Sequence, residues 1–225
     1  VQYRMNQWIS HFASKESYGG QLRAHPSVAR RLLAFAPSSG QLSTEIRSIS
    51  RALHPNLPMV FLDMAGATDE QDGPKTSIAE ARAVRELVAG LLARSITEAD
   101  IGIIAPYKAQ VANIRRHLFV DDAATAWKAL SPSTPLSVDT VDRFQGGERA
   151  VMILSFATTT TPEVGGQLRR HLTDPNRLNV ALTRAQRKLI LVGHAHALES
   201  LPVFGRLLAY CRDMQALILH SFTSR

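Results

Sequence analysis

Two arginines in one short segment are the residues of this sequence best suited to act on an anion. Asp174 and Pro175 are typical of a helix N-terminus, and leucine and alanine then recur at helical spacing over residues 178–185. Arg177 and Arg184 lie seven residues apart, so they share a face beside this apolar stripe. An arginine near a buried stripe needs an anionic partner, because an unpaired buried charge is costly. The pattern leaves open whether that partner is a carboxylate of the chain or a phosphate.

Two sequence features resemble parts of a phosphate-binding and a magnesium-binding site, but neither fits that role. Residues 73–76 read Gly-Pro-Lys-Thr, like the end of a phosphate-binding loop, but the proline separates the glycine from the lysine. Asp63 follows an apolar run, as a magnesium-binding carboxylate would, but Met64 stands where an acidic partner is often found. We therefore interpret Asp63 as an ordinary strand end, and we predict no metal site.

The elements that position these residues are predicted by hydrophobic patterns. Four apolar runs have strand length: Met59–Leu62, Ile101–Ala105, Val151–Leu154 and Leu189–Val192. They lack polar alternation, which is typical of strands buried in a parallel sheet. Helical spacing marks Ser77–Leu92 and Lys108–Leu118 between them. The sequence therefore predicts an α/β fold with an open, mostly parallel sheet and helices on both faces.

Length and composition predict one domain over residues 1–225, of which 45% are hydrophobic. Residues 36–58 are rich in Ser, Pro and Gly, which predicts a surface excursion within this domain. No apolar run reaches the about 18 residues of a membrane span. The abrupt first residues predict a fragment of a longer chain. A single cysteine, Cys211, fits a reducing, cytoplasmic location.

The charge balance permits a polyanionic partner. Lys and Arg number 26 against 19 Asp and Glu, a net charge of +7, and 21 of the 26 are arginine. Guanidinium groups bind phosphate through a planar fork of donors. A genome that favours arginine codons explains the excess equally well.

Four segments resemble motifs of the Upf1-like superfamily 1 helicases, in the order of that family. They are Gln2–Met5 (motif IV), Ile104–Gln110 (the PY-x-x-Q turn), Val138–Glu148 (motif V) and Arg177–Ala185 (motif VI). The resemblance implies the C-terminal RecA-like (2A, AAA_12-type) domain of a DNA or RNA helicase. Departures from the usual pattern stand at Asn6-Gln7, Ser77 and Thr158, and no role is carried onto those positions.

The resemblance implies three catalytic residues. Arg184 and Arg4 would reach the γ-phosphate of ATP, where a desolvated guanidinium stabilises the charge that phosphoryl transfer spreads over the oxygens. Gln145 would relay between the ATP site and the nucleic-acid site. A structural ion pair is the alternative role for each arginine.

Three further residues are implied in nucleotide binding together with the two arginines. Tyr3 would offer its ring to the adenine, unless it is a core tyrosine. Glu148 would accept hydrogen bonds from the ribose, unless it pairs with Arg149 or Arg143 on the surface. Gly147 would let the backbone approach the nucleotide.

The implied nucleic-acid contacts are Pro106, Tyr107, Gln110 and Thr140, because hydroxyl, amide and backbone donors suit phosphate and a ring suits a base. Tyr107 fits a packing role equally well.

The function implied is ATP-dependent, 5′-to-3′ translocation on a single strand, with DNA favoured over RNA. ATP and Mg²⁺ would bind between this domain and an N-terminal RecA-like half, which would hold most of the Mg²⁺ ligands. The chain lacks Walker A and B motifs, so we predict that it is inactive by itself. The alternatives are a non-catalytic nucleic-acid-binding module and the helicase part of a nuclease–helicase fusion.

Overall fold

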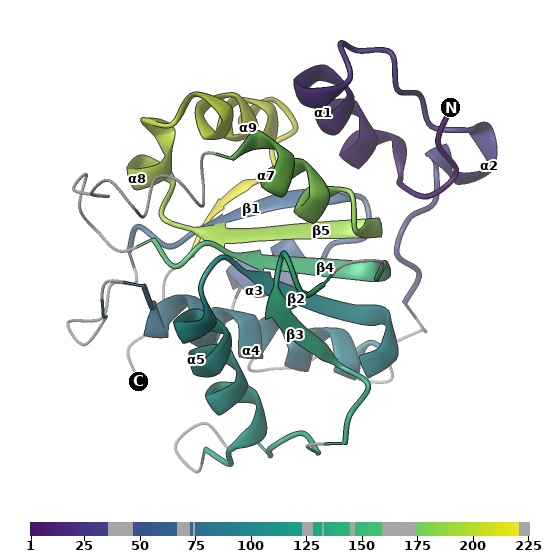
Figure 1. The fold of residues 1–225 in the computed structure, drawn as a ribbon. Coiled ribbons are helices and arrows are strands. Elements are labelled where there is room, and N and C mark those ends of the chain that lie inside the picture. The colour runs from purple at the N-terminus through teal and green to yellow at the C-terminus, as the bar shows by residue number, and fades with distance from the viewer. Residues whose placement is uncertain are drawn as a thin grey trace.

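A single six-stranded sheet organises the part of the chain that the computed structural model describes, which is residues 1–35, 47–66, 73, 75–122, 128–131, 133–144, 147–158 and 174–220. All pairings between named strands are parallel, and the strand order is β3-β2-β4-β5-β1-β6 (Figure 1). The strands are β1 (Met59–Asp63), β2 (Ile101–Ala105), β3 (Ser137–Thr140), β4 (Arg149–Ser155), β5 (Ala185–Gly193) and β6 (Leu217–Leu219). The predicted α/β class with a parallel sheet is confirmed, and the four predicted strands are β1, β2, β4 and β5.

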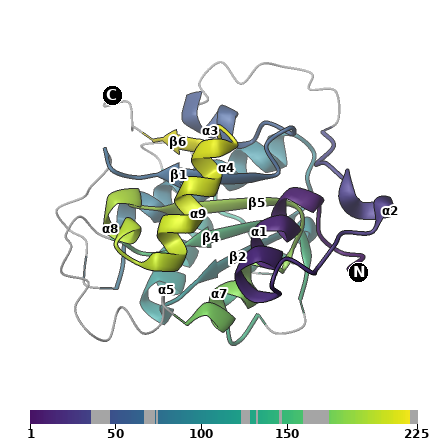
Figure 2. The same cartoon turned by 90° about the horizontal axis from the view of Figure 1, so that it is seen from above.

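Helices cover both faces of the sheet (Figures 1 and 2). One face carries α3 (Arg47–Ala52), α4 (Ile78–Ala93) and α5 (Lys108–Phe119). The other carries α1 (Gln7–Ser17), α7 (Pro175–Leu182), α8 (Ala195–Glu199) and α9 (Pro202–Asp213). Two short elements are α2 (Pro26–Ala29) and the 3₁₀ turn η1 (Glu98–Asp100). None of the helices described is both long and apolar enough to cross a membrane.

Two hydrophobic cores explain why the strand sequences lack polar alternation. Along β1, Val60 and Leu62 pack into the core under α4, whereas Met59 and Phe61 pack into the core under α9. All four side chains are buried, because successive residues of a strand point to opposite faces and both faces are covered.

The predicted helix starts are confirmed by their caps. The Ser77 side chain accepts a hydrogen bond from the backbone N–H of Glu80 at the start of α4. The Asp174 carboxylate accepts one from Asn176 N–H, 2.9 Å away, and Pro175 occupies the first turn of α7. These contacts satisfy backbone donors that the first turn of a helix leaves without partners.

The described part of the predicted surface excursion is mixed, because some of its residues pack into the core whereas others, such as Ser50 and Asn56, are exposed. Ile49 and Leu53, in and just after α3, are buried against α4. The turn after them is held by Lys188, whose ammonium group donates to the carbonyls of His54 and Leu57 at 2.9 and 2.7 Å. Burial lowers the pKa of Lys188 to about 7. Residues 36–46 of the excursion lie outside the described residues.

Candidate functional site

The predicted nucleotide residues meet at the amino-terminal edge of the sheet. Arg149 and Ala185 pair at the starts of β4 and β5, so Glu148 and Arg184 lie directly before two neighbouring strands. The N–H of Arg149 donates to the carbonyl of Arg184 at 3.1 Å. Motif V and motif VI are therefore joined at this edge.

The N-terminal segment docks beside them. The backbone N–H of Asn6 donates to the carbonyl of Gln186 on β5 at 2.8 Å. The Gln2 side-chain oxygen accepts from the N–H groups of Arg4 and Met5, both at 2.8 Å, and its amide donates to the Met5 carbonyl. This network fixes the turn from which Arg4 projects.

Arg4 and Glu148 form an ion pair at this edge. One guanidinium N–H of Arg4 also donates to the Thr183 carbonyl at 3.3 Å, and Gln186 donates to the other carboxylate oxygen of Glu148 at 2.8 Å. The Arg4 and Glu148 side chains are 42% and 40% exposed, so water screens their attraction. An incoming nucleotide could therefore displace this ion pair and bind either group at a modest cost in free energy.

Arg184 and Arg177 do not share the helical face that the sequence predicted, because α7 ends at Leu182 and Arg184 directly precedes β5. The two arginines also differ in their partners. Within the described residues, the Nε atom of Arg184 is buried without a hydrogen-bond partner, and no carboxylate pairs with this side chain. Arg177 instead lies 3.5 Å from Asp142 and 3.6 Å from Asp174. Arg177 therefore has carboxylates of the chain near it, whereas Arg184 retains a buried donor that an incoming anion could satisfy.

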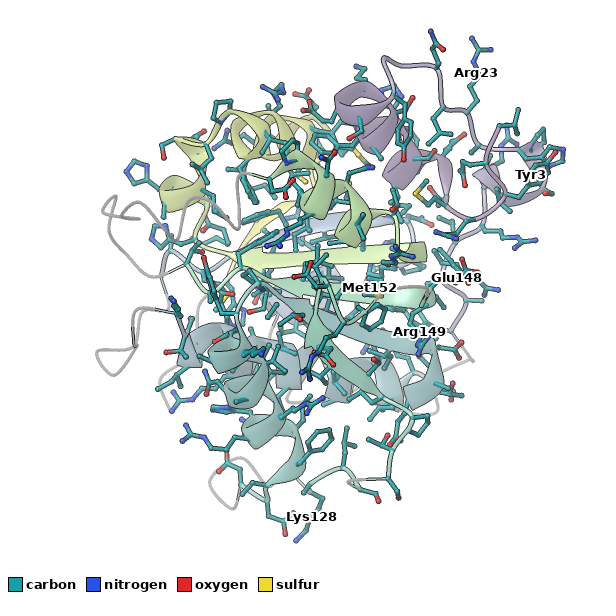
Figure 3. The ribbon with its side chains drawn as sticks, in the orientation of Figure 1. Tyr3, Arg23, Lys128, Glu148, Arg149 and Met152 are labelled. Atoms are coloured by element: carbon teal, nitrogen blue, oxygen red, sulfur yellow. The ribbon has the colours of Figure 1, made fainter. Side chains whose placement is uncertain are left out.

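Tyr3 is a surface residue, which removes the core alternative. Its side chain is 65% exposed, and its ring stacks on His25 with the centroids 4.4 Å apart. The backbone of His25 donates to the Gln2 carbonyl at 2.9 Å, and the Nδ1 atom of His25 accepts from the N–H of Ser27 at 3.2 Å. The histidine thus holds one face of an exposed aromatic ring at the same end of the molecule as Glu148 (Figure 3).

The glycine at position 147 is explained by packing. A Cβ atom at Gly147 would lie 3.1 Å from the ring of Phe144, and the guanidinium of Arg149 lies over that ring at 5.7 Å. The close approach to the Phe144 ring therefore favours glycine here, and contact with a nucleotide stays a prediction. Gln145 lies outside the described residues.

Two of the residues predicted to contact the single-stranded nucleic acid lie at the opposite, carboxyl-terminal edge of the sheet. Thr140 is the last residue of β3 and pairs with Ala105, and Pro106 follows directly. Both Thr140 and Pro106 are half-buried. Because Glu148 immediately precedes β4, the segment after Thr140 returns from this edge to the nucleotide edge. Motif V is therefore the direct covalent link between the two predicted sites.

The other two residues predicted to contact the single-stranded nucleic acid, Tyr107 and Gln110, are buried in this structure, and that contact stays a prediction. Tyr107 is 5% exposed, and burial raises its pKa to about 12. The Gln110 side chain is fully buried: its oxygen accepts from Ser77 N–H at 2.8 Å, and its amide donates to the Ser155 hydroxyl at 3.0 Å. In this conformation Gln110 ties α5 to the start of α4 and the end of β4, beneath the edge where Pro106 is accessible.

Sequence reasoning missed Glu80, a buried carboxylate under the same edge. It accepts hydrogen bonds from the Ser155 hydroxyl at 2.6 Å and from the N–H groups of Ala157 and Thr158, both at 2.9 Å. Burial raises the pKa of Glu80 to about 7, although these hydrogen bonds act in the opposite direction. Ala157 has a positive φ of 53°, a strained conformation that the Glu80 carboxylate helps to hold. The spacing from Ser77 to Glu80 suits a helix cap, so this long-range role had no signal in the sequence.

Comparisons with known proteins show the family of the chain. The model of the AAA_12 family, described as an AAA domain, matches residues 1–196. The chain is 34% identical over 207 residues to DNA polymerase alpha-associated DNA helicase A of Saccharomyces cerevisiae, covering 88% of this chain and 28% of that protein. It is 34% identical over 207 residues to DNA-binding protein SMUBP-2 of Rattus norvegicus, covering 89% and 18%. It is 31% identical over 230 residues to DNA replication ATP-dependent helicase/nuclease DNA2 of Mus musculus, covering 97% and 20%.

The parallel α/β sheet and the motifs at its two edges define the class, a C-terminal RecA-like domain of the superfamily 1 helicase type. Within that class, the chain belongs to the AAA_12 family of AAA domains. It spans 18–28% of the length of these relatives, so it corresponds to one part of much longer proteins.

Proposed function

We propose that this chain is the second motor domain of an ATP-dependent helicase that translocates on single-stranded nucleic acid, 5′ to 3′ as in the Upf1-like type. The observation that carries the proposal is the buried Nε atom of Arg184, which has no hydrogen-bond partner in the part of the chain that the structure describes and lies beside Arg4 and Glu148 at one edge of the sheet. The names of the yeast and mouse relatives, which both include helicase, support the same activity. Residues 1–225 form one domain in this proposal, because both cores share one sheet.

ATP is the proposed nucleotide, bound with Mg²⁺ between this domain and an N-terminal RecA-like half that supplies most of the magnesium ligands. Arg184 would place two guanidinium donors on the γ-phosphate oxygens, where negative charge is stabilised during phosphoryl transfer. Desolvation around its buried Nε atom strengthens that interaction, because the local dielectric is lower than in water.

The exposed Arg4–Glu148 pair would exchange partners when ATP binds. Arg4 would turn to phosphate, while Glu148 would accept hydrogen bonds from the ribose hydroxyls and keep its contact with Gln186. Tyr3, held from behind by His25, would stack on the adenine. Gly147 and Gln145 lie on the same motif V segment, and we assign Gln145 the relay between the nucleotide and the strand.

The single strand would cross the carboxyl-terminal edge at Pro106 and Thr140, with Tyr107 and Gln110 supporting that edge from below. DNA is favoured over RNA because the relatives are named for DNA. A reducing, cytoplasmic location suits Cys211, which is buried and whose pKa burial raises to about 12, so that its thiol is unreactive.

A nuclease–helicase fusion is the second candidate, because the mouse relative is named a helicase/nuclease. In that case the helicase role of this domain is unchanged, and the nuclease lies elsewhere in the longer chain. A non-catalytic nucleic-acid-binding module is the third reading, and it predicts strand binding without ATP turnover.

The test is ATP hydrolysis by the full-length protein and by the 225-residue chain, each with and without a DNA single strand. We expect strand-stimulated turnover by the full-length protein and background turnover by the chain alone. Strand binding with no turnover by the full-length protein supports the non-catalytic module. Turnover by the chain alone contradicts a site shared between two halves.

A further inference from the structure

A tight turn at residues 73–76 is the segment whose sequence resembles the end of a phosphate-binding loop. The N–H of Gly73 donates to the Thr76 hydroxyl oxygen at 3.0 Å, and the N–H of Thr76 donates to the Gly73 carbonyl at 3.1 Å. A phosphate-binding loop instead aims its backbone N–H groups at the phosphates. Since these two donors are used inside the turn, the exposed side chain of Lys75 is the group here that suits an anion.

The residue after the turn, Ser77, ties it to α5 and to the end of β4. The Ser77 N–H donates to the side-chain oxygen of Gln110 at 2.8 Å, and the Ser77 carbonyl accepts from the side-chain amides of Gln110 and Asn113, both at 3.1 Å. The Gln110 amide also donates to the Ser155 hydroxyl at 3.0 Å. Because Ser77, Gln110 and Ser155 are buried, water does not compete for these hydrogen bonds, and they fix the place of the turn.

Lys75 lies over the ring of Tyr107, the residue at the start of α5. Its ammonium nitrogen is 6.0 Å from the ring centroid, a distance at which the face of a ring attracts a cation. Tyr107 is 5% exposed, so packing holds the ring in place. Among the described residues, no carboxylate forms an ion pair with Lys75. The ring thus positions the ammonium group and leaves its N–H donors and its charge available to an anion.

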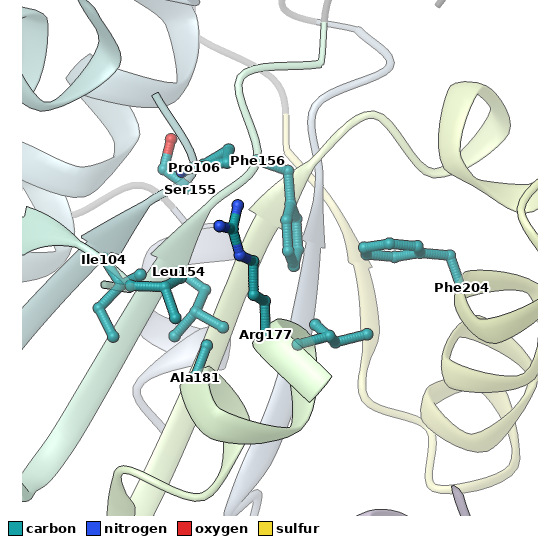
Figure 4. Close-up of a pocket in the computed structure, with 10 residues that line it drawn as sticks. Ile104, Pro106, Leu154, Ser155, Phe156, Arg177, Ala181 and Phe204 are labelled. Atoms are coloured by element: carbon teal, nitrogen blue, oxygen red, sulfur yellow. The ribbon is translucent and has the colours of Figure 1, made fainter. Parts of the chain in front are cut away.

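The position of Lys75 continues the predicted path of the single strand. Thr140 ends β3 on one side of β2, and Pro106 directly follows β2. Pro106 and Ser155 line the same small pocket, side by side at the ends of β2 and β4 (Figure 4). Because the turn that carries Lys75 is tied to Ser155, Lys75 extends the path from Thr140 and Pro106 toward β4.

We propose that Lys75 binds a phosphate of the single strand, with the Tyr107 ring holding its ammonium group in place. The inference rests on the proposed function and adds to the strand path a residue that lies outside the four motifs. A phosphate contact carries no sequence information, so Lys75 would bind strands of any sequence. The burial of Tyr107 fits this role, since a ring fixed by packing can support Lys75 without contacting the strand.

The experiment uses the full-length protein and a labelled thymidine homopolymer, with the dissociation constant measured by fluorescence anisotropy over a range of salt. Lys75→Gln should weaken binding about fivefold at about 50 mM salt and about twofold at about 200 mM, because each phosphate contact on a single strand adds about 0.7 to the slope of log K against log salt. The slope itself should therefore fall by about 0.7. An adenosine homopolymer should show the same loss.

Two further variants separate a phosphate contact from a general effect of charge. Lys75→Arg should keep most of the affinity and the salt slope, because a guanidinium also binds phosphate and rests on an aromatic face. Lys15→Gln is the matched control, since Lys15 is an exposed lysine on α1, which covers the other face of the sheet. It changes the net charge by the same amount and should leave strand binding near wild type.

Tyr107→Leu tests the role of the ring, because it removes the aromatic face and keeps an apolar side chain. It should weaken strand binding in the wild-type background and have little further effect in the Lys75→Gln background, since the ring acts through Lys75. Equal losses in the two backgrounds would overturn the support that the inference assigns to the ring.

The outcomes separate the inference from the proposed function. A Lys75→Gln variant with the wild-type salt slope, or with no greater loss than Lys15→Gln, overturns the phosphate contact. If that variant still shows strand-stimulated ATP hydrolysis, the motor domain stands without it. If the full-length protein does not bind single strands at all, both proposals fail.

Discussion

Replacing Glu80 by glutamine should change how the stability of this chain depends on pH. In wild type the carboxyl is fully buried, and burial raises its pKa from 4.5 to about 7 against the opposing hydrogen bonds from Ser155, Ala157 and Thr158. The folded state therefore binds this proton more tightly than the unfolded state does. The stabilisation is fully present below the unfolded pKa of 4.5, and it is lost as the pH rises to about 7.

The size of the effect follows from the shift. Each unit of pKa corresponds to about 1.4 kcal/mol, so the shift of Glu80 corresponds to roughly 3 kcal/mol in all, most of it lost between about pH 5 and 8. Glu80→Gln keeps a neutral group of similar shape, and this part of the pH dependence should disappear. The variant should also be less stable than wild type at low pH, because the NH₂ group of the glutamine side chain then faces one of the hydrogen-bond donors that the carboxyl group accepts from.

The assay is urea unfolding of the 225-residue chain at several pH values, followed by far-UV circular dichroism. Glu86→Gln is the matched control: burial also raises the pKa of Glu86 to about 7, so its removal should leave the Glu80 contribution in place. A Glu80→Gln variant with the wild-type slope between pH 5 and 8 would refute the reasoning. The carboxyl of Glu80 would then already be ionised at pH 5, because its hydrogen-bond donors would lower its pKa more than burial raises it.

Three further predictions concern the full-length protein. Glu148→Gln should raise the KM for ATP in steady-state kinetics, with a smaller change for 2′-deoxy-ATP. Equal effects on the two nucleotides would leave Glu148 with its structural contacts to Arg4 and Gln186 alone. His25→Ala should raise the KM for ATP severalfold at unchanged kcat, because the Tyr3 ring loses the ring that stacks behind it. His25→Phe should restore the KM. A fall in kcat rather than a rise in KM for His25→Ala would argue against a stacking role. Thr140→Ala should weaken single-strand binding in a salt titration whereas Arg184→Ala should not, and equal losses would mean that the two edges of the sheet have been assigned wrongly.

Most of the sheet could be predicted from the sequence, because its central strands are continuous apolar runs between helical patterns. The strands β3 and β6 were missed. β3 (Ser137–Thr140) is half-buried along most of its length, and Leu219 in β6 is 64% exposed. β3 contains a single apolar residue, Val138, so hydrophobic pattern alone does not mark it. Residues 216–219 form an apolar run as long as three of the four from which strands were predicted, so β6 had a signal in the sequence that was not used.

The candidate site was predictable only in part. Local pattern left the partners of Arg177 and Arg184 open, since ion pairs between residues distant in sequence depend on the fold. The burial of Gln110 could not be read from its type, because an amide is tolerated in a core only where partners such as Ser77 and Ser155 happen to meet it. Glu80 was overlooked for the same reason.

The most direct test of the central claim is the kcat of strand-stimulated ATP hydrolysis by the full-length protein with Arg184→Lys and Arg184→Ala. If Arg184 acts as a two-pronged donor on the γ-phosphate, both variants should lose about 10³-fold or more, because a point charge does not replace the guanidinium fork. Arg212→Ala, which removes an exposed arginine paired with Glu199, should stay near wild type. Recovery of most of the rate by Arg184→Lys would contradict the account, since Arg184 would then supply positive charge alone.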